Sequence, residues 1–261
     1  MSVENGEWIM HGLDESDPAC IHSIEELIEY INQVGFLPLF KNEIPGFSVE
    51  ERTVPDFWWS GDASKDPWEW RAIIAREGKV AYGKLYGNKA GFVSKEWLPY
   101  LANVRRDGYD FDALWEDGKA SRRQKMIMDL FLEEDESLVK EFYSNELKEK
   151  AGFGKNGEKG FDSVLSSLQM QTYLIVRDFR QRKNKKGQSY GWAVAVVTTP
   201  EHIFGRDLVT AAYAEEPEES VRKILEKVRR HFPEAEEGTV RRIVLNQKGV
   251  SKKNLQRFLC L

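Results

Sequence analysis

Two glutamines separated by one methionine, Gln169-Met170-Gln171, are the residues of this chain whose types and spacing best suit chemistry. Side chains alternate between faces on a strand, so the two carboxamides would project together only if the segment is extended. The pair offers hydrogen-bond donors and acceptors but no titratable group. It can hold a water molecule or stabilise developing positive charge, and it cannot act as a general base near neutral pH.

Two aspartates lie close enough in the sequence to complete such a site. Asp178 follows Gln171 by seven residues, and Asp162 precedes the pair. Asp178 is flanked by Arg177 and Arg180, so an ion pair is the competing interpretation. Asp162 would lie in the first turn of a helix, where the helix dipole favours a carboxylate. We expect Asp178 to be the catalytic carboxylate of the site, with Asp162 as the other candidate.

Three helices followed by a long hairpin are expected to position these residues. Periodicity and capping residues predict helices over 121–133, 143–151 and 160–168. A strand over 169–182, a turn over 184–187 and a returning strand over 189–199 are predicted to follow them. The turn is polar, and its Asn and Gly accept positive φ at little cost. This order predicts a winged helix-turn-helix domain. A generic α+β module with the same order is the alternative.

Basic residues gather at the predicted hairpin, although the net charge of the whole chain is −5. That net charge argues against a protein that coats nucleic acid indiscriminately. A basic hairpin on an otherwise acidic protein is the layout expected for localised phosphate contacts, and a solvated hairpin tip is the alternative. The residues expected to bind nucleic acid are Arg177, Arg180, Arg182, Lys183, Lys185 and Lys186.

A second candidate binding feature is the dense run of tryptophans between residues 58 and 70. Clustered aromatic residues serve a hydrophobic core more often than a binding site. A base flipped out of DNA nevertheless needs an aromatic or apolar slot in which to stack. We expect Trp68 or Trp70, beside Arg71, to supply such a slot.

The fold class expected for the chain is α+β. We expect a flexible leader over 1–20 and a Trp-rich N-terminal α/β region over 21–118. The winged-helix domain is expected over 119–200 and a C-terminal helical region over 201–261. Within the N-terminal region, prolines predict irregular structure over 36–53. Ser94 is expected to cap a helix over 95–106, and 109–115 is expected to be a linker.

Composition excludes several classes of protein. Hydrophobic residues make up 41% and charged residues 31%, which describes a globular chain. No window approaches the roughly 20 apolar residues of a membrane span. Cys20 and Cys260 lie at opposite ends, the histidines are scattered, and the phosphate-binding Gly-rich loops and the nucleophile elbow are absent. We therefore expect a cytoplasmic protein without metal, cofactor or membrane association, and the sequence defines no protein partner.

The chain also resembles the AlkZ-related family, small proteins similar to the AlkZ-type DNA glycosylases. The resemblance covers roughly 36–213, and the motifs that carry it are Gly35-Phe36-Leu37-Pro38, Pro67-Trp68-Glu69-Trp70, Tyr82-Gly83-Lys84, Arg105-Arg106-Asp107-Gly108-Tyr109-Asp110-Phe111-Asp112, Leu168-Gln169-Met170-Gln171-Thr172-Tyr173 and Tyr190-Gly191-Trp192. AlkZ-type enzymes are built from winged helices and carry a glutamine–apolar–glutamine motif after a helix. This chain is shorter, and its motif lies late in the sequence.

The resemblance implies a DNA-repair role, with duplex DNA as the partner. AlkZ-type enzymes excise N7-alkylated purines, so a monofunctional DNA glycosylase, a hydrolase that uses Gln169 and Gln171, is implied. N7-alkylation makes the purine a good leaving group, so a positioned water and electrostatic support suffice. Two alternatives stay open: a non-catalytic nucleic-acid-binding protein, and a winged-helix module that contacts a protein or a small ligand.

Overall fold

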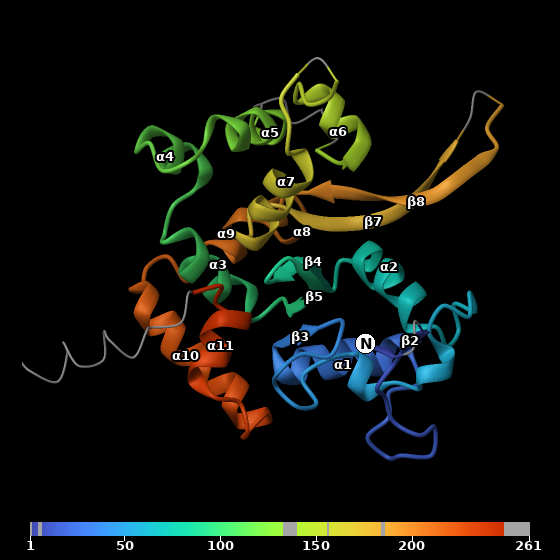
Figure 1. Ribbon diagram of the computed structural model, residues 1–261. Helices are drawn as coiled ribbons and strands as arrows, with labels where there is room; N and C mark the ends of the chain where they lie inside the picture. Colours follow the sequence, from blue (N-terminus) through green and yellow to red (C-terminus); the bar gives the residue numbers. More distant parts are fainter. Residues whose placement is uncertain (1, 5–6, 133–139, 156, 184–185, 248–261) are drawn as a thin grey trace, which may run out of the picture.

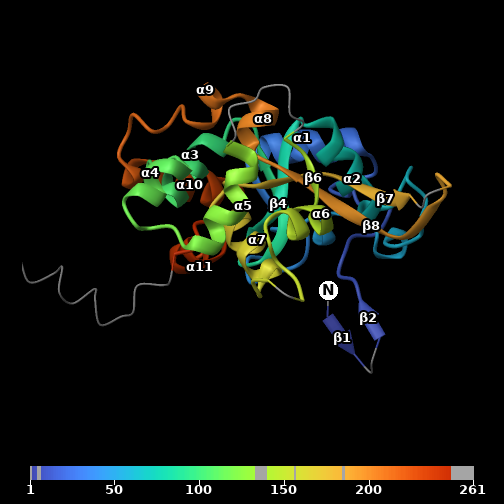
Figure 2. The ribbon, with the colours of Figure 1, turned by 90° about the horizontal axis from the view of Figure 1, so that it is seen from above.

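The computed structural model describes residues 2–4, 7–132, 140–155, 157–183 and 186–247 (Figure 1). These residues form a mixed α/β structure with two three-stranded antiparallel sheets. A short pair of N-terminal strands, β1 (Ser2–Glu4) and β2 (Glu7–Ile9), projects away from the body (Figure 2). The mixed α/β character expected from the sequence is therefore confirmed.

The first three-stranded sheet is built from the N-terminal part of the chain. Helix α1 (Ile24–Val34) is capped by Ser23, as its sequence indicates, and leads into strand β3 (Phe36–Pro38). After two short 3-10 turns, helix α2 (Pro67–Glu77) precedes the hairpin of β4 (Val80–Tyr86) and β5 (Lys89–Ser94). The strand order is β3-β5-β4.

The expectation of irregular structure over 36–53 was wrong at its start. Residues Phe36–Pro38 pair with β5 and are fully buried. Proline is tolerated there because β3 lies at an edge of the sheet, where a missing N–H removes no ladder bond.

The second sheet repeats this order of elements later in the chain. Helix α5 (Arg122–Leu132) is followed by the two-residue strand β6 (Phe142–Tyr143), helix α6 (Ser144–Lys150) and helix α7 (Phe161–Met170). The hairpin of β7 (Ile175–Lys183) and β8 (Ser189–Thr198) then closes the sheet in the order β6-β8-β7. In both sheets the first, short strand therefore pairs with the last strand of the hairpin.

The boundary between α7 and β7 differs from the expected one. A strand was predicted over 169–182, but the helix continues to Met170 and the strand begins only at Ile175. Gln169 and Met170 are good helix formers, and Leu165 and Leu168 keep an apolar face buried up to the helix end. Thr172, at φ +65°, then turns the chain into the strand.

Two expectations between the sheets also need correction. Helix α3 (Leu98–Arg106) begins three residues after the predicted start, at a Trp97 N-cap rather than at Ser94. The predicted linker contains helix α4 (Phe111–Glu116), because the Asp110 side chain accepts the N–H of Ala113 and caps a helical turn. Acidic linker residues therefore act as a helix start.

Helices of the C-terminal part cover one side of the body. They are α8 (Pro200–Phe204), α9 (Arg206–Val209), α10 (Pro217–His231) and α11 (Glu237–Ile243). The amphipathic α10 packs along α3 (Figures 1 and 2). No helix among the described residues has the length and apolar character that crossing a membrane requires.

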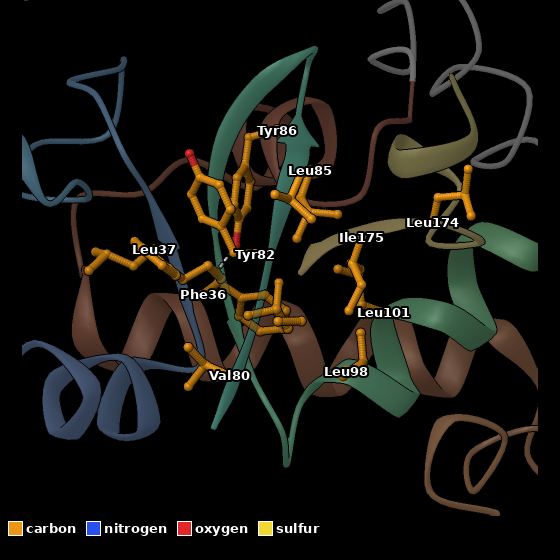
Figure 3. Packing of buried hydrophobic residues seen from close by; sticks show 14 of the residues in the cluster. Phe36, Leu37, Val80, Tyr82, Leu85, Tyr86, Leu98, Leu101, Leu174 and Ile175 are labelled. Carbon is orange, nitrogen blue, oxygen red and sulfur yellow. Dashed lines mark hydrogen bonds between the residues drawn. The ribbon is translucent and has the colours of Figure 1, made fainter. Parts of the chain in front are cut away.

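One hydrophobic core runs through both sheets. Tyr82 and Leu85 of β4 lie with Leu98 and Leu101 of α3, and with Ile175 at the start of β7 (Figure 3). The segment expected to be a flexible leader is attached to this body, because the Leu13 N–H donates to the Thr53 carbonyl over 3.1 Å. The two sheet units are thus packed together, and the space between them is where the candidate site lies.

Candidate functional site

A cavity of about 900 Å³ lies between the two sheet units. Its volume falls within the roughly 300–1,000 Å³ range of small-ligand sites. Helix α2 and strand β4 form one side, and α7 with the β7–β8 hairpin forms the other. The walls include Trp68, Arg71, Tyr82, Lys84, Asp162, Gln169 and Phe179. Trp68 and Arg71 of the expected base slot are therefore brought to one site with Asp162 and Gln169 of the expected catalytic group.

Gln169 lies in this wall with only 3% of its surface exposed. Its Oε1 accepts the N–H of Lys84 over 2.9 Å, and its Nε2 donates to the Leu165 carbonyl over 3.5 Å. Strand β4 is an open edge of its sheet, so the carboxamide supplies an acceptor that no neighbouring strand provides. A Cβ at Gly83 would lie 3.1 Å from the same oxygen, so glycine allows this close approach. Gln169 thus joins the two units.

Gln171 points elsewhere. It is the C-cap residue of α7, and its Oε1 accepts a hydrogen bond from Nε2 of Gln124 on α5 over 2.7 Å. Gln171 is not among the residues that line the cavity. The expectation of an extended segment with both carboxamides on one face was therefore wrong, because residues two apart diverge on a helix.

Asp178 is buried in a network of ion pairs. Its Oδ1 accepts from Nε of Arg76 over 3.0 Å and from the Phe179 N–H over 2.7 Å, and its Oδ2 accepts from Nε of Arg180 over 2.7 Å. Both carboxylate oxygens are therefore engaged, which is the ion-pair interpretation of the sequence. Asp162, in the first turn of α7, is exposed and lines the cavity.

Arg71 has the most unusual environment in the cavity wall. Its guanidinium carbon lies 3.4 Å from the ring centroid of Trp68 and 4.5 Å from that of Phe179. The guanidinium donates to the Trp68 carbonyl and interacts with the hydroxyl of Tyr82. Burial lowers the pKa of Arg71, and burial raises the pKa of Tyr82 to about 12. Among the described residues, no carboxylate forms a salt bridge with Arg71.

The other tryptophans of the cluster occupy different positions. Trp70 is 1% exposed and donates its indole N–H to the Ala63 carbonyl over 3.2 Å, so it is a core residue away from the cavity. Trp59 is half-exposed and packs against Trp68, with ring centroids 6.3 Å apart. Of the two tryptophans proposed for a base slot, only Trp68 therefore lines the cavity.

The basic residues of the hairpin fall into two groups. At its base, Arg177 donates to the Ala75 carbonyl over 2.8 Å, and both Arg177 and Arg180 pair with Glu141. Nearer the tip, Arg182 and Lys186 are exposed. Lys185 and the side chain of Lys183 lie outside the described residues. The base arginines thus hold the hairpin on the body, and the tip carries the exposed cations.

Sequence reasoning missed the role of Arg105. This buried arginine donates to the Met170 carbonyl over 2.8 Å, to the Val244 carbonyl over 2.7 Å and to the Leu85 carbonyl. Burial lowers its pKa to about 10. Its neighbour Arg106 donates to the Thr172 carbonyl over 2.6 Å. The two arginines therefore fix the turn that follows Gln169. The sequence feature that could have indicated this role is the pair of adjacent arginines at the end of a helix.

Metal chemistry finds no support in the part of the chain that the structure describes, where no group of three or more His, Cys, Asp or Glu residues could hold an ion.

Comparisons with known proteins give one family and one solved structure. A family model described as AlkZ related matches residues 21–245. The DNA glycosylase AlkZ of Streptomyces sahachiroi is similar in structure, with 14% sequence identity and a TM-score of 0.48, over 93% of this chain and 60% of that one. The chain thus spans about three fifths of the length of that glycosylase. A search of curated proteins gives no match.

Proposed function

The chain belongs to the AlkZ-related family, and we propose that it binds duplex DNA and acts as a DNA glycosylase on N7-alkylated purines. In this proposal one purine leaves the duplex and enters the cavity between the two sheet units. The observation that carries the proposal is the cavity itself. It brings an aromatic ring and a planar cation of α2 together with a carboxamide and a carboxylate of α7, namely Trp68, Arg71, Gln169 and Asp162.

We further propose that residues 119–200 form a winged helix and that 21–118 contain a second one. Support comes from the order helix, short strand, helix and hairpin, which occurs in both units. The short strand pairs with the last strand of the hairpin in both sheets. In the first unit, 3-10 turns stand where the second unit has α6.

In this proposal the β7–β8 hairpin is the element that contacts DNA phosphates. Arg182 and Lys186 are exposed near its tip, the sequence between them adds Lys183 and Lys185, and its inner half forms part of the cavity wall. Helix α7 is unsuited to reading a groove, because Leu165, Ser166 and Gln169 are buried where it packs on the first unit. A hairpin that holds the backbone beside the cavity would place an extrahelical base within reach of it.

The chemistry we propose places a water molecule at Gln169 with Asp162 as the nearby carboxylate. The Oε1 of Gln169 accepts from Lys84, and one N–H of its Nε2 donates to the Leu165 carbonyl, so the second N–H of Nε2 is the group that would orient the water. Asp178 is less suited, because two arginines already engage its oxygens. Little acid catalysis is required, because an N7-alkylated purine leaves as a neutral base.

Single-turnover release of N7-methylguanine from a duplex tests the proposal. The wild-type protein is expected to release the base, and Gln169→Met is expected to slow release by about 10²-fold or more, the scale of removing one electrostatic contact to a transition state. Gln171→Met is the matched control, since the same change is made outside the cavity and release should stay close to wild type. Absence of release by the wild-type protein would remove the glycosylase proposal.

A second function, DNA binding without excision, is favoured by the divergence of Gln169 and Gln171. Fluorescence anisotropy with plain and N7-methylated duplexes across a salt series separates the two. Salt-dependent binding of both duplexes with no base release supports the binding protein. If neither duplex binds at physiological salt, both proposals fail and a protein or small ligand becomes the partner to seek.

A further inference from the structure

We propose that the aromatic slot formed by Trp68 and Phe179 binds a planar cationic base. In the free protein the Arg71 guanidinium occupies this slot, and it leaves the slot when the base enters. The inference rests on the proposed function, because it names the chemical class of base that the cavity receives. It also makes the slot selective for a charged ring over a neutral one.

The Arg71 guanidinium lies against the aromatic rings of Trp68 and Phe179. A guanidinium is a flat, delocalised cation, and it lies over both rings at 3.4 and 4.5 Å from their centroids. Both distances fall within the roughly 6 Å over which a ring attracts a cation. The Trp68 ring comes from the first unit and the Phe179 ring from the second. The slot therefore exists only because the two units pack together.

Two oxygen atoms lie beside the guanidinium in the slot. The Trp68 carbonyl accepts a hydrogen bond from the guanidinium, and the Tyr82 hydroxyl interacts with it as well. Two aromatic faces with oxygen atoms at the edge suit a planar cation that carries N–H groups. An N7-alkylated guanine that is still joined to its sugar has this description, because its ring is flat and positively charged and has an N1–H and an exocyclic amine. Arg71 therefore shows which ligand chemistry the slot accommodates.

Arg71 is held in the slot without a salt bridge to any described residue, and Asp66 and Glu69 attract it only at longer range. The residue is 8% exposed, and among the described residues no carboxylate forms a salt bridge with it. Burial disfavours the charged form more than these attractions favour it, so the pKa of Arg71 is lowered. A long side chain in this situation regains hydration, or pairs with a DNA phosphate, when it swings outward. Entry of a cationic base thus exchanges one cation for another.

Direct binding of nucleosides tests this exchange without DNA and without excision. Calorimetry would compare N7-methylguanosine with guanosine at mildly acidic pH, where the methylated ring keeps its N1 proton and its charge. The wild-type protein is expected to bind both weakly. Arg71→Ala empties the slot, and its affinity for N7-methylguanosine should rise about tenfold, the fold-change expected of one buried cation–π contact. Its affinity for guanosine should rise much less.

Two further variants separate the slot from simple charge repulsion. Lys84→Ala removes a positive charge from the same cavity wall but leaves the slot filled, so no gain is expected. Arg71→Lys keeps the charge, yet an ammonium is strongly hydrated and lacks a flat face, so it should hold the slot less well and give an intermediate gain. Arg71→Lys also preserves the test if Arg71→Ala fails to fold, which circular dichroism would report.

Three results would overturn the inference: equal gains in Arg71→Ala and Lys84→Ala, equal gains for the two nucleosides, or no gain in any folded Arg71 variant. These results are independent of the glycosylase proposal. A protein that releases no N7-methylguanine from DNA can still show the nucleoside preference, and an active glycosylase can lack it.

Discussion

The two hairpins of this protein, β4–β5 and β7–β8, have the same place in their sheets and opposite surroundings. In β4 every residue except Lys84 is buried, and the last four residues of β5 are buried as well. In the outer half of β7, Arg180, Gln181 and Arg182 are exposed, and the hairpin extends past α2 (Figure 1). One hairpin therefore belongs to the core, while the other extends from the body into solvent.

The difference shows that a repeated order of elements does not make two units equivalent. The β4–β5 hairpin carries buried apolar residues on both faces, Tyr82 with its partner Phe92 on one and Ala81 with its partner Val93 on the other, so it is covered on both sides. The outer β7–β8 hairpin carries charged residues that remain in water. Side-chain chemistry, rather than strand order, thus decides which hairpin stabilises the fold and which one is available to a partner.

The largest expected effect comes from the core hairpin. Phe92→Ala should lower the free energy of unfolding by about 3–5 kcal/mol, because Phe92 is fully buried and the change leaves a cavity. Arg182→Ala, on the exposed part of the other hairpin, should change it by no more than about 0.5 kcal/mol. Urea unfolding followed by circular dichroism measures both. Similar losses of unfolding free energy in the two variants would contradict the assignment of one hairpin to the core and the other to solvent.

A medium effect is expected where the two units meet. Gln169→Met removes the acceptor of the Lys84 N–H and should cost about 1–3 kcal/mol of unfolding free energy, because it leaves a backbone donor unpaired between the units. Gln171→Met, which removes only a half-buried bond to Gln124, should cost about 1 kcal/mol or less. The same unfolding measurement ranks them, and the reverse ranking would contradict the joining role of Gln169.

Locally encoded features of the fold were predictable from the sequence. Asp66 accepts the N–H of Trp68 and caps α2, and Pro67 lies at its first position, as the pattern Asp-Pro indicates. Ser23 caps α1 from directly before its apolar stripe, and the returning strand of the long hairpin, expected over 189–199, is found at Ser189–Thr198. In each case the signal and the structure it determines lie within a few residues of each other.

Features that depend on distant contacts were not predictable. The end of α7 is fixed partly by Arg105, which donates to the Met170 carbonyl from 65 residues away. The pairing of Trp68 with Arg71 follows from their spacing of three on a helix, and the sequence placed them together. Phe179, however, comes from the other sheet unit, so the filled slot required the structure.

The smallest expected effect on stability is at the two hairpin tips, where the comparison can be made most directly. Lys186 and Lys89 occupy equivalent places, near the turn of the second and the first hairpin, and both are exposed. Changing either to glutamine should leave the unfolding free energy within about 0.5 kcal/mol. Only Lys186→Gln should reduce the slope of log K against log salt for duplex DNA, by about 0.9 for one lost phosphate contact.

Fluorescence anisotropy at four or more salt concentrations would give both slopes. Adding Arg182→Gln to Lys186→Gln should roughly double the reduction, because each cation neutralises its own phosphate. A slope reduced equally by Lys89→Gln would show that both hairpins contact DNA despite their different burial. In that case the duplex would have to lie across the two sheet units. The cavity would then lie between two sites of phosphate contact, whereas in the present proposal it lies beside a single site.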